Sequence, residues 1–168
     1  DESYIKGTAI CLQAIKNLLD PQKKIILLWG DLALWRVSDL HITIKIHEIL
    51  ESIITFPTRV KKDPYVAFLR SINGEPSSIM HSNENNSFKG FAEQDCLKFV
   101  CDFESLNHID HFIDSKTEFG EVDFVHLIPY LAERKYFVVP LPISKYEIVY
   151  GLNTPKRAKV IENILKKY

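Results

Sequence analysis

Apolar residues in this 168-residue chain recur with two spacings, one typical of helices and the other typical of strands. The helical spacing is clearest over residues 3–19 and 154–168, where apolar side chains share one face. We expect Ser3 to cap the first helix, and Thr154, followed by Pro155, to cap the last. The buried faces of these two helices should consist of Ile5, Ala9, Leu12, Ile15, Leu18, Leu19, Ala158, Ile161, Ile164 and Leu165.

The longest apolar-rich stretch, residues 24–54, holds both tryptophans and should supply the centre of the core. Residues 24–29 form a continuous apolar run, which predicts a strand buried on both faces with Trp29 inside the core. Over residues 39–55 the apolar positions suit either an alternating strand or a helix. We predict one helix there, closed by Pro57.

Runs rich in β-branched and aromatic residues predict further strands in the rest of the chain. These strands are expected over residues 65–72, 97–103, 136–139 and 146–150. Asn73 and Gly74 indicate a hairpin turn after the first of them, since both residues tolerate a positive φ. Pro76 then places the returning strand at a sheet edge.

Two segments of the second half carry helical signals. Ser105 should cap a short helix in which Leu106, Ile109, Phe112 and Ile113 share a face. Residues 122–128 form either a strand, with Pro129 opening a helix after it, or part of a helix kinked at the proline. Helices and strands therefore interleave along the chain. This order predicts one mixed α/β (α+β) domain over residues 1–168, with about five strands and the terminal helices packed on the sheet.

Composition and charge narrow the class of protein. The hydrophobic fraction is 46% and the charged fraction 26%, which is typical of a globular domain, and the net charge of −1 disfavours a dedicated nucleic-acid binder. No apolar run reaches the 18 residues that a membrane span needs. Three cysteines do not suit a disulfide framework. We therefore expect an intracellular protein, in the cytoplasm or nucleus, and a domain excised from a longer chain.

The segment LLWGDLALWRVSDLHITI, residues 27–44, resembles the signature of the nucleotidyltransferase superfamily. In that signature a strand ends in Gly-Gly or Gly-Ser, and a later strand carries two aspartates one residue apart. Gly30 and Asp39 stand at matching positions. The resemblance implies an enzyme in which Asp39 helps to hold Mg²⁺ against nucleotide phosphates. The chain departs from the pattern because Asp31 replaces the small second residue and His41 replaces the second aspartate.

Other catalytic and metal-binding patterns are incomplete. His108 and His111 lie three residues apart on an expected helix and could share a metal ion, but the polar face of that helix accounts for them equally. No serine lies in a GxSxG elbow, and the six glycines form no phosphate-binding loop. The sequence therefore predicts no metal site, no cofactor and no defined set of catalytic residues.

Basic residues suggest where a partner would bind. Residues 58–63 are polar and basic, and the usual explanation for such a segment is a solvated loop. The candidates for docking an acidic partner are Arg59, Lys61, Lys62, Lys156, Arg157 and Lys159. Residues 121–152 can also be interpreted as half of a winged helix, which would bind nucleic acid weakly through its phosphates.

Our leading hypothesis from the sequence is a non-catalytic protein–protein interaction domain, a scaffold subunit of a larger intracellular assembly. The abundance of tyrosines at expected strand ends supports it, because tyrosine is enriched at interfaces. The alternatives are a divergent nucleotidyltransferase-like enzyme that uses Asp39, and the nucleic-acid module over residues 121–152. The sequence leaves the oligomeric state open.

Overall fold

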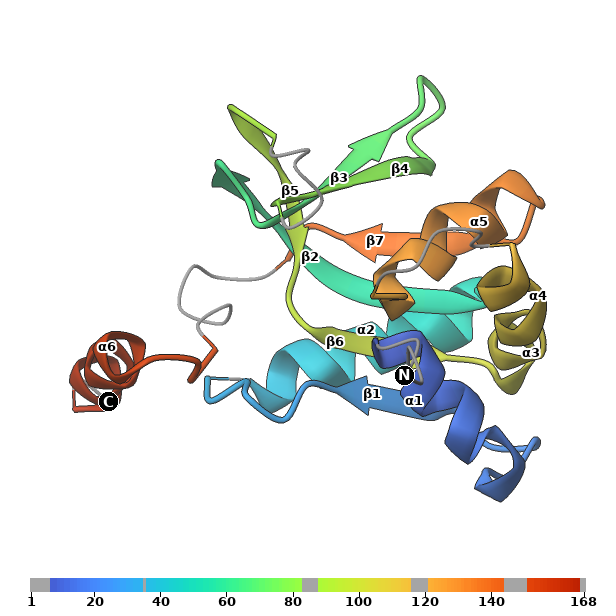
Figure 1. Cartoon of the computed structure of the whole chain (residues 1–168), viewed down its shortest axis with the longest axis horizontal. Helices are drawn as coiled ribbons and strands as arrows, with labels where there is room; N and C mark the ends of the chain where they lie inside the picture. The colour runs from blue at the N-terminus through green and yellow to red at the C-terminus, as the bar shows by residue number, and fades with distance from the viewer. Residues whose placement is uncertain (1–6, 35, 83–87, 116–120, 144–150, 167–168) are drawn as a thin grey trace, which may run out of the picture.

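The computed structural model describes residues 7–34, 36–82, 88–115, 121–143 and 151–166. Seven strands in these residues form one open sheet with the order β1-β6-β2-β5-β3-β4, and β7 pairs with β2 beside that path (Figure 1). All pairings are antiparallel except that of β2 with β7. The mixed α+β fold predicted from the sequence is confirmed, with seven strands instead of about five.

The elements follow one another in the interleaved order that the sequence predicts. The strands are β1 (Ile25–Leu28), β2 (Ile54–Lys62), β3 (Val66–Arg70), β4 (Pro76–His81), β5 (Phe91–Asp95), β6 (Lys98–Cys101) and β7 (Val138–Leu141). The α-helices are α1 (Thr8–Ile15), α2 (Val37–Leu50), α3 (Phe103–Asn107), α4 (Ile109–Asp114), α5 (Leu127–Glu133) and α6 (Pro155–Leu165). Single 3₁₀ turns, η1 (Lys16–Leu18) and η3 (Phe124–His126), follow α1 and precede α5.

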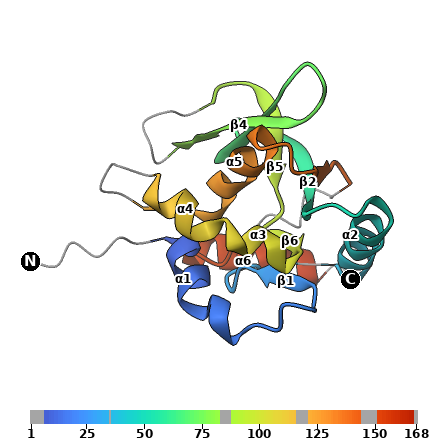
Figure 2. The same ribbon diagram turned by 90° about the vertical axis from the view of Figure 1, so that its right-hand side faces the viewer.

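The two faces of the sheet differ in character. Figure 2 shows α1, α4 and α5 on one side of the strands and α2 on the other. The apolar core lies on the first side, where Phe56, Phe99 and Phe124 are completely buried among side chains of α1 and α3 to α5. The α2 side is more polar, because Thr55, Arg59 and Lys98 are buried there. The sheet therefore separates an apolar interior from a polar layer.

Strand β1 was expected at the centre of the core and lies instead at an edge of the sheet. Among the described strands it pairs with β6 alone, and Ile25 is buried toward the core while Ile26 and Leu28 on the opposite face are exposed. Trp29 is half-buried, although its ring contacts those of Phe99 and Phe124. The prediction of a strand buried on both faces is wrong, since a continuous apolar run does not reveal how many neighbours a strand has.

Helix α2 confirms the single helix predicted over residues 39–55, but it is oriented differently from the expectation. The side chains that it buries against the sheet are Asp39, Thr43 and His47, whereas Ile42 and Ile49 are exposed. The helix ends at Glu51, which takes a left-handed conformation with φ of 49°, rather than at Pro57. Pro57 lies inside β2, where it pairs with Leu141 of β7.

The hairpin prediction is confirmed. Strands β3 and β4 pair antiparallel around Gly74, whose φ of 83° requires the conformational freedom of glycine. Pro76 opens β4, which is the edge strand that the proline predicts. Strand β5, with the sequence FAEQD, was not predicted, since it lacks a clear apolar alternation.

The helices of the second half also depart from the expectation in detail. The predicted helix capped by Ser105 is two short helices, α3 and α4, and Asp102 occupies the position before the first. All four apolar residues expected on its inner face are buried. Residues 122–128 form no strand; instead η3 leads into α5, with Pro129 in its first turn. A proline is tolerated there because the first-turn N–H groups have no partner within the helix.

Both terminal helices are present in the described part of the chain, but each buries fewer of the expected apolar residues, and α6 buries Ile161 while Leu165 is exposed. Helix α1 buries Ala9 and Leu12, but Ile15 and Leu18 are exposed; Ser3, the expected cap, lies outside the described residues. Helix α6 begins as predicted, at Pro155. The strand expected over residues 146–150 also lies outside the described residues. None of the described helices has the length and apolar character needed to cross a membrane.

Candidate functional site

The chain turns sharply where β1 ends, and this turn meets the segment that leads into α6. The Leu32 amide donates a hydrogen bond to the Trp29 carbonyl oxygen at 3.1 Å, which closes the turn around Gly30 and Asp31. Leu32 then pairs with Gly151, and the Leu152 amide donates to the Asp31 carbonyl oxygen at 2.8 Å. Two segments that are about 120 positions apart in the chain are therefore fixed side by side (Figure 1).

The Asp31 carboxylate lies directly over Gly151. A Cβ atom at position 151 would stand 2.5 Å from Asp31 Oδ2 and 2.8 Å from Asn153 Oδ1, which is closer than any side chain permits. Among the described residues the Asp31 carboxylate makes no hydrogen bond or ion pair. Glycine at 151 therefore leaves room for two oxygen ligands, a carboxylate and an amide, to approach one point. Oxygen ligands of this kind suit Mg²⁺.

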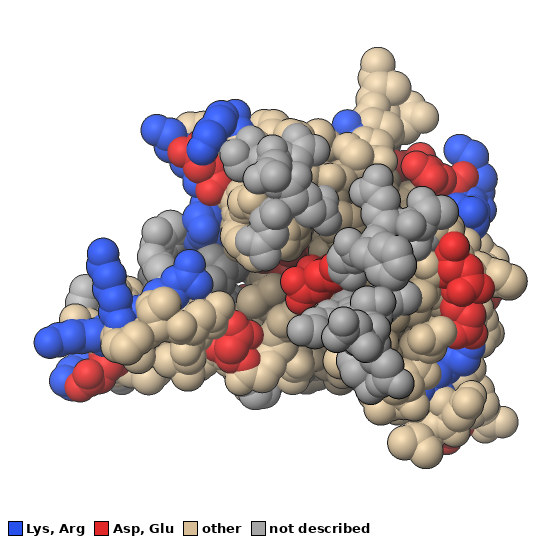
Figure 3. All heavy atoms as spheres, in the orientation of Figure 1, with Lys and Arg blue, Asp and Glu red and all other residues tan. Residues whose placement is uncertain are grey.

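The first turn of α6 follows this point immediately. Thr154 caps the helix, and its Oγ1 accepts a hydrogen bond from the Arg157 amide at 3.2 Å. Lys156 and Arg157 are exposed on this turn. Figure 3 shows Lys and Arg side chains gathered over the α6 end of the molecule, at the left of the view. A helix N-terminus with two cations suits an anionic group such as a phosphate.

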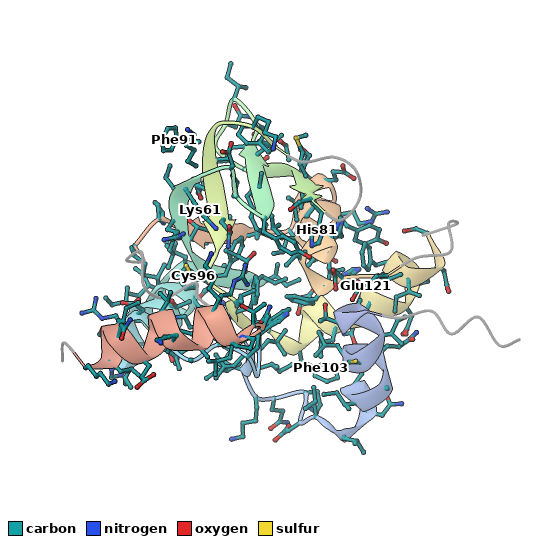
Figure 4. The ribbon with its side chains drawn as sticks, turned by 60° about the vertical axis from the view of Figure 1, so that its left-hand side comes forward. Lys61, His81, Phe91, Cys96, Phe103 and Glu121 are labelled. Carbon is teal, nitrogen blue, oxygen red and sulfur yellow. The ribbon has the colours of Figure 1, made fainter. Side chains whose placement is uncertain are left out.

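The polar face of the sheet continues from this site toward β2. Side chains alternate along a strand, so Arg59 and Lys61 share the face of Thr55, which contacts α2 through His47. In Figure 4, Lys61 of β2 and Cys96, from the turn between β5 and β6, lie above α6 in the view. Lys98 lies on the same face, close enough to Asp39 of α2 to interact with its charge. This face of the sheet therefore carries three basic side chains, those of Arg59, Lys61 and Lys98.

Lys98 and Asp39 are both buried, which is unusual for charged residues. Burial lowers the pKa of Lys98, and the negative charge of Asp39 partly opposes that shift. Asp39, the residue that the nucleotidyltransferase resemblance implies as a metal ligand, lies in the first turn of α2 with its side chain 6% exposed. The structure therefore places Asp39 inside the protein and near Lys98, and the carboxylate at the turn after β1 is that of Asp31.

A second buried polar cluster anchors the other end of α2. His47 Nε2 lies 3.0 Å from Asp102 Oδ1, and His47 Nδ1 lies 3.1 Å from Thr55 Oγ1 and 3.2 Å from Ser52 Oγ. Lys24 also pairs with Asp102. The arrangement contains a serine, a histidine and an aspartate, but Ser52 is completely buried. Burial lowers the pKa of His47, so the ring is neutral near pH 7 and the cluster stabilises the packing of α2.

The turn between β5 and β6, which presents Lys98 to α2, contains a buried carboxylate. Asp95 Oδ1 accepts a hydrogen bond from the Leu97 amide at 2.8 Å, and Leu97 has a positive φ of 54°. Burial raises the pKa of Asp95 to about 6, whereas its usual value is 3.8. Between these values the folded protein binds more protons than the unfolded chain, so this residue lowers stability increasingly as pH rises from about 4 to 6.

Asp95→Asn is expected to raise the free energy of unfolding by about 2 kcal/mol at pH 7.5, because the amide keeps the acceptor for Leu97 without a buried charge. At pH 4 the gain should fall to about 0.5 kcal/mol, since Asp95 is then protonated in the folded state and only partly ionised in the unfolded chain. Urea unfolding of both proteins at the two pH values measures the difference. A variant less stable than the parent at pH 7.5 would contradict this account of Asp95.

The residues predicted to dock a partner differ in their exposure. Lys156, Arg157 and Lys159 are exposed on α6, but Arg59, expected in a solvated loop, is buried within β2. The expected loop over residues 58–63 is wrong, because the strand that follows α2 extends as far as Lys62 and pairs with β5.

The alternative metal and nucleic-acid sites have less support. The His108 ring packs on Tyr136 with centroids 4.6 Å apart, and the described residues contain no group of three acidic, histidine or cysteine side chains placed to hold a metal. The strand β7, expected as the first strand of a winged hairpin within residues 121–152, pairs in parallel with β2 of the main sheet. The second strand of that hairpin lies outside the described residues.

Comparisons with known proteins find similar structures but no match by sequence. No protein-family model matches the chain, and no curated protein matches it by sequence. Two solved structures of HddC from Yersinia pseudotuberculosis share its fold. One is complexed with GMP-PN and superposes with a TM-score of 0.59 at 14% identity, and the other gives 0.60 at 13% identity. Each superposition covers 97% of this chain and 64% of HddC.

The relationship to HddC establishes the fold alone at this level of identity. The chain spans about 64% of the length of HddC, so a third of that protein has no counterpart here. The sequence did not identify Asp31, Gly151 and Asn153 as one site. The Gly-Asp pair after an apolar strand was visible, but nothing in the local spacing connects it with the segment before α6.

Proposed function

We propose that this chain forms the metal- and phosphate-binding part of a nucleotidyltransferase-like domain, and that it binds a nucleoside phosphate through a divalent cation at Asp31. The observation that carries the proposal is the Asp31 carboxylate over Gly151, beside Asn153 and the start of α6. The likeness to HddC, which was solved in complex with GMP-PN, supports a nucleotide as the ligand. We favour this proposal over the leading hypothesis from the sequence, a non-catalytic protein–protein interaction domain.

The chemistry of the site fits one Mg²⁺ ion. Mg²⁺ retains several water ligands and is commonly held by one or two carboxylates together with substrate phosphates. Asp31 would supply the carboxylate and Asn153 a neutral oxygen, and the space over Gly151 accommodates a ligand that a larger side chain would exclude. When bound, the cation would neutralise part of the charge on the nucleotide phosphates.

The chain's own residues would hold and orient the phosphates around that ion. The side chains of Lys156 and Arg157, in the first turn of α6, offer donors and positive charge to an anion at the start of the helix. In this proposal, these cations contact phosphate groups instead of an acidic protein. The hydrogen bond from Leu152 to the Asp31 backbone fixes the distance between the carboxylate and the helix.

Asp31→Asn is expected to weaken binding of GTP in the presence of MgCl₂ by at least about tenfold, because the variant lacks the carboxylate over Gly151 that would hold the ion. Isothermal titration calorimetry with and without MgCl₂ measures the effect. Gly151→Ala should weaken binding similarly, since its Cβ would displace the Asp31 carboxylate.

Asp114→Asn is the matched control, because Asp114 is an exposed carboxylate on α4 without a polar partner among the described residues. It should leave affinity unchanged. GTP binding that is independent of Mg²⁺, or equal in the Asp31 and Asp114 variants, would refute the proposed site.

A further inference from the structure

Two buried side chains of opposite charge lie near each other, one on α2 and one on β6. The Asp39 carboxylate is 6% exposed and Lys98 is completely buried. Among the described residues, Asp39 Oδ2 and Lys98 Nζ have no hydrogen-bond partner. The Asp39 backbone carbonyl oxygen, in contrast, accepts a hydrogen bond from Thr43 Oγ1 at 2.7 Å. The unpaired groups therefore belong to the side chains and not to the helix backbone. Unpartnered buried polar groups are costly, which makes this pair a candidate binding site.

The chemistry of the pair limits what could satisfy it. A phosphate would accept hydrogen bonds from Lys98 but would be repelled by the Asp39 carboxylate, and a metal ion would bind Asp39 but be repelled by the lysine. A hydroxyl group satisfies both, because it donates to a carboxylate and accepts from an amine. Two neighbouring hydroxyl groups on a sugar ring could therefore bond to both residues at once, by donating to Asp39 and accepting from Lys98.

The pair adjoins the proposed phosphate site. Lys98 stands opposite Leu28 in the β1–β6 ladder, and the Trp29 amide donates to the Leu97 carbonyl oxygen at 3.3 Å. Asp31 follows two residues after Trp29. Asp39 lies at the start of α2, so Asp31 and Asp39 flank the same connection between β1 and α2. A nucleotide whose phosphates lie at Asp31 has its ribose within a few bonds of them.

We infer that Asp39 and Lys98 form a subsite that binds the ribose hydroxyl groups of the nucleotide. This inference rests on the proposed function and adds the recognition of ribose to it. Binding requires the start of α2 to open enough to admit the sugar, which would give Asp39 and Lys98 the hydrogen bonds that they lack in the described structure.

The test compares GTP with 2′,3′-dideoxy-GTP in the presence of MgCl₂, by calorimetry on the whole chain. We expect the parent protein to bind GTP at least about tenfold more tightly, since hydrogen bonds to charged groups are among the strong ones. The double variant Asp39→Leu/Lys98→Met replaces the pair with apolar side chains of similar size, which commonly preserves folding. It should bind both ligands equally, with the affinity that the parent has for the dideoxy compound.

Each outcome decides a different point. If the parent binds both ligands equally and with Mg²⁺ dependence, the ribose hydroxyls make no contact with the pair and the ribose subsite is refuted, while the proposed function stands. If the double variant keeps the preference for GTP, the hydroxyls bind elsewhere and the inference fails. If neither ligand binds the parent protein, the proposed function and the subsite both fail.

Discussion

Replacing Phe99 with alanine is expected to lower the free energy of unfolding by about 3–5 kcal/mol. Phe99 is completely buried in β6, and its ring lies 5.2 Å from those of Trp29, Phe56 and Phe124, measured between centroids. Truncation would therefore leave a cavity at the point where the aromatic core meets the sheet. Urea denaturation at pH 7.5 measures the loss.

Trp29→Ala should cost less than Phe99→Ala, because Trp29 is only half-buried at the edge of the core. Phe91→Ala is the surface control: Phe91 is 71% exposed on β5, and the change should stay within about 0.5 kcal/mol. If Trp29→Ala were the more damaging of the two core changes, the centre of the core would lie near β1 after all.

Ile161→Asp is expected to destabilise the isolated domain by several kcal/mol, because it buries an unpaired charge. Ile161 is 3% exposed and is the buried residue of α6, the helix that follows the proposed site. Loss of its packing should also displace Gly151 from Asp31, so nucleotide binding should weaken at temperatures where the domain remains folded. Thermal and urea unfolding, followed by calorimetry, measure both effects.

Leu165→Asp is the matched control on the same helix. Leu165 is 57% exposed, which differs from the expectation that it belongs to the buried stripe. It should unfold like the parent protein. A normal melt for Ile161→Asp would mean that the α6 stripe is an interface with another molecule and that α6 does not pack on the domain.

The features predicted correctly from the sequence are those encoded over a few neighbouring residues. Thr154 and Pro155 mark the start of α6 because a cap and a fixed φ act within one turn. Gly74 marks the hairpin for the same kind of reason. Helix α2 was predicted from the spacing of its apolar residues, but the face that it turns toward the sheet was not. That face is polar, and its partners, Thr55 in β2 and Asp102 before α3, are distant in the sequence.

The candidate site depends on contacts that local patterns do not carry. Asp31 was noted as a departure from the nucleotidyltransferase signature, and Asp39 was favoured because it matches the position of a signature carboxylate. Asp39 is buried near Lys98, whereas Asp31 lies over Gly151 because Leu32 and Gly151 form a bridge between distant segments. The need for glycine at position 151 cannot be predicted from the sequence, because it depends on the nearby Asp31 and Asn153 side chains.

The most direct test of the central claim is nuclear magnetic resonance of the labelled chain with GTP and Mn²⁺ in place of Mg²⁺. A paramagnetic ion at Asp31 should broaden the amide signals of Leu32, Gly151 and Leu152, which the structure holds around that carboxylate. Asp31→Asn should abolish this broadening. Broadening centred on His108 and His111 of the α3–α4 region, or no selective broadening at all, would contradict a metal-dependent nucleotide site at the end of β1.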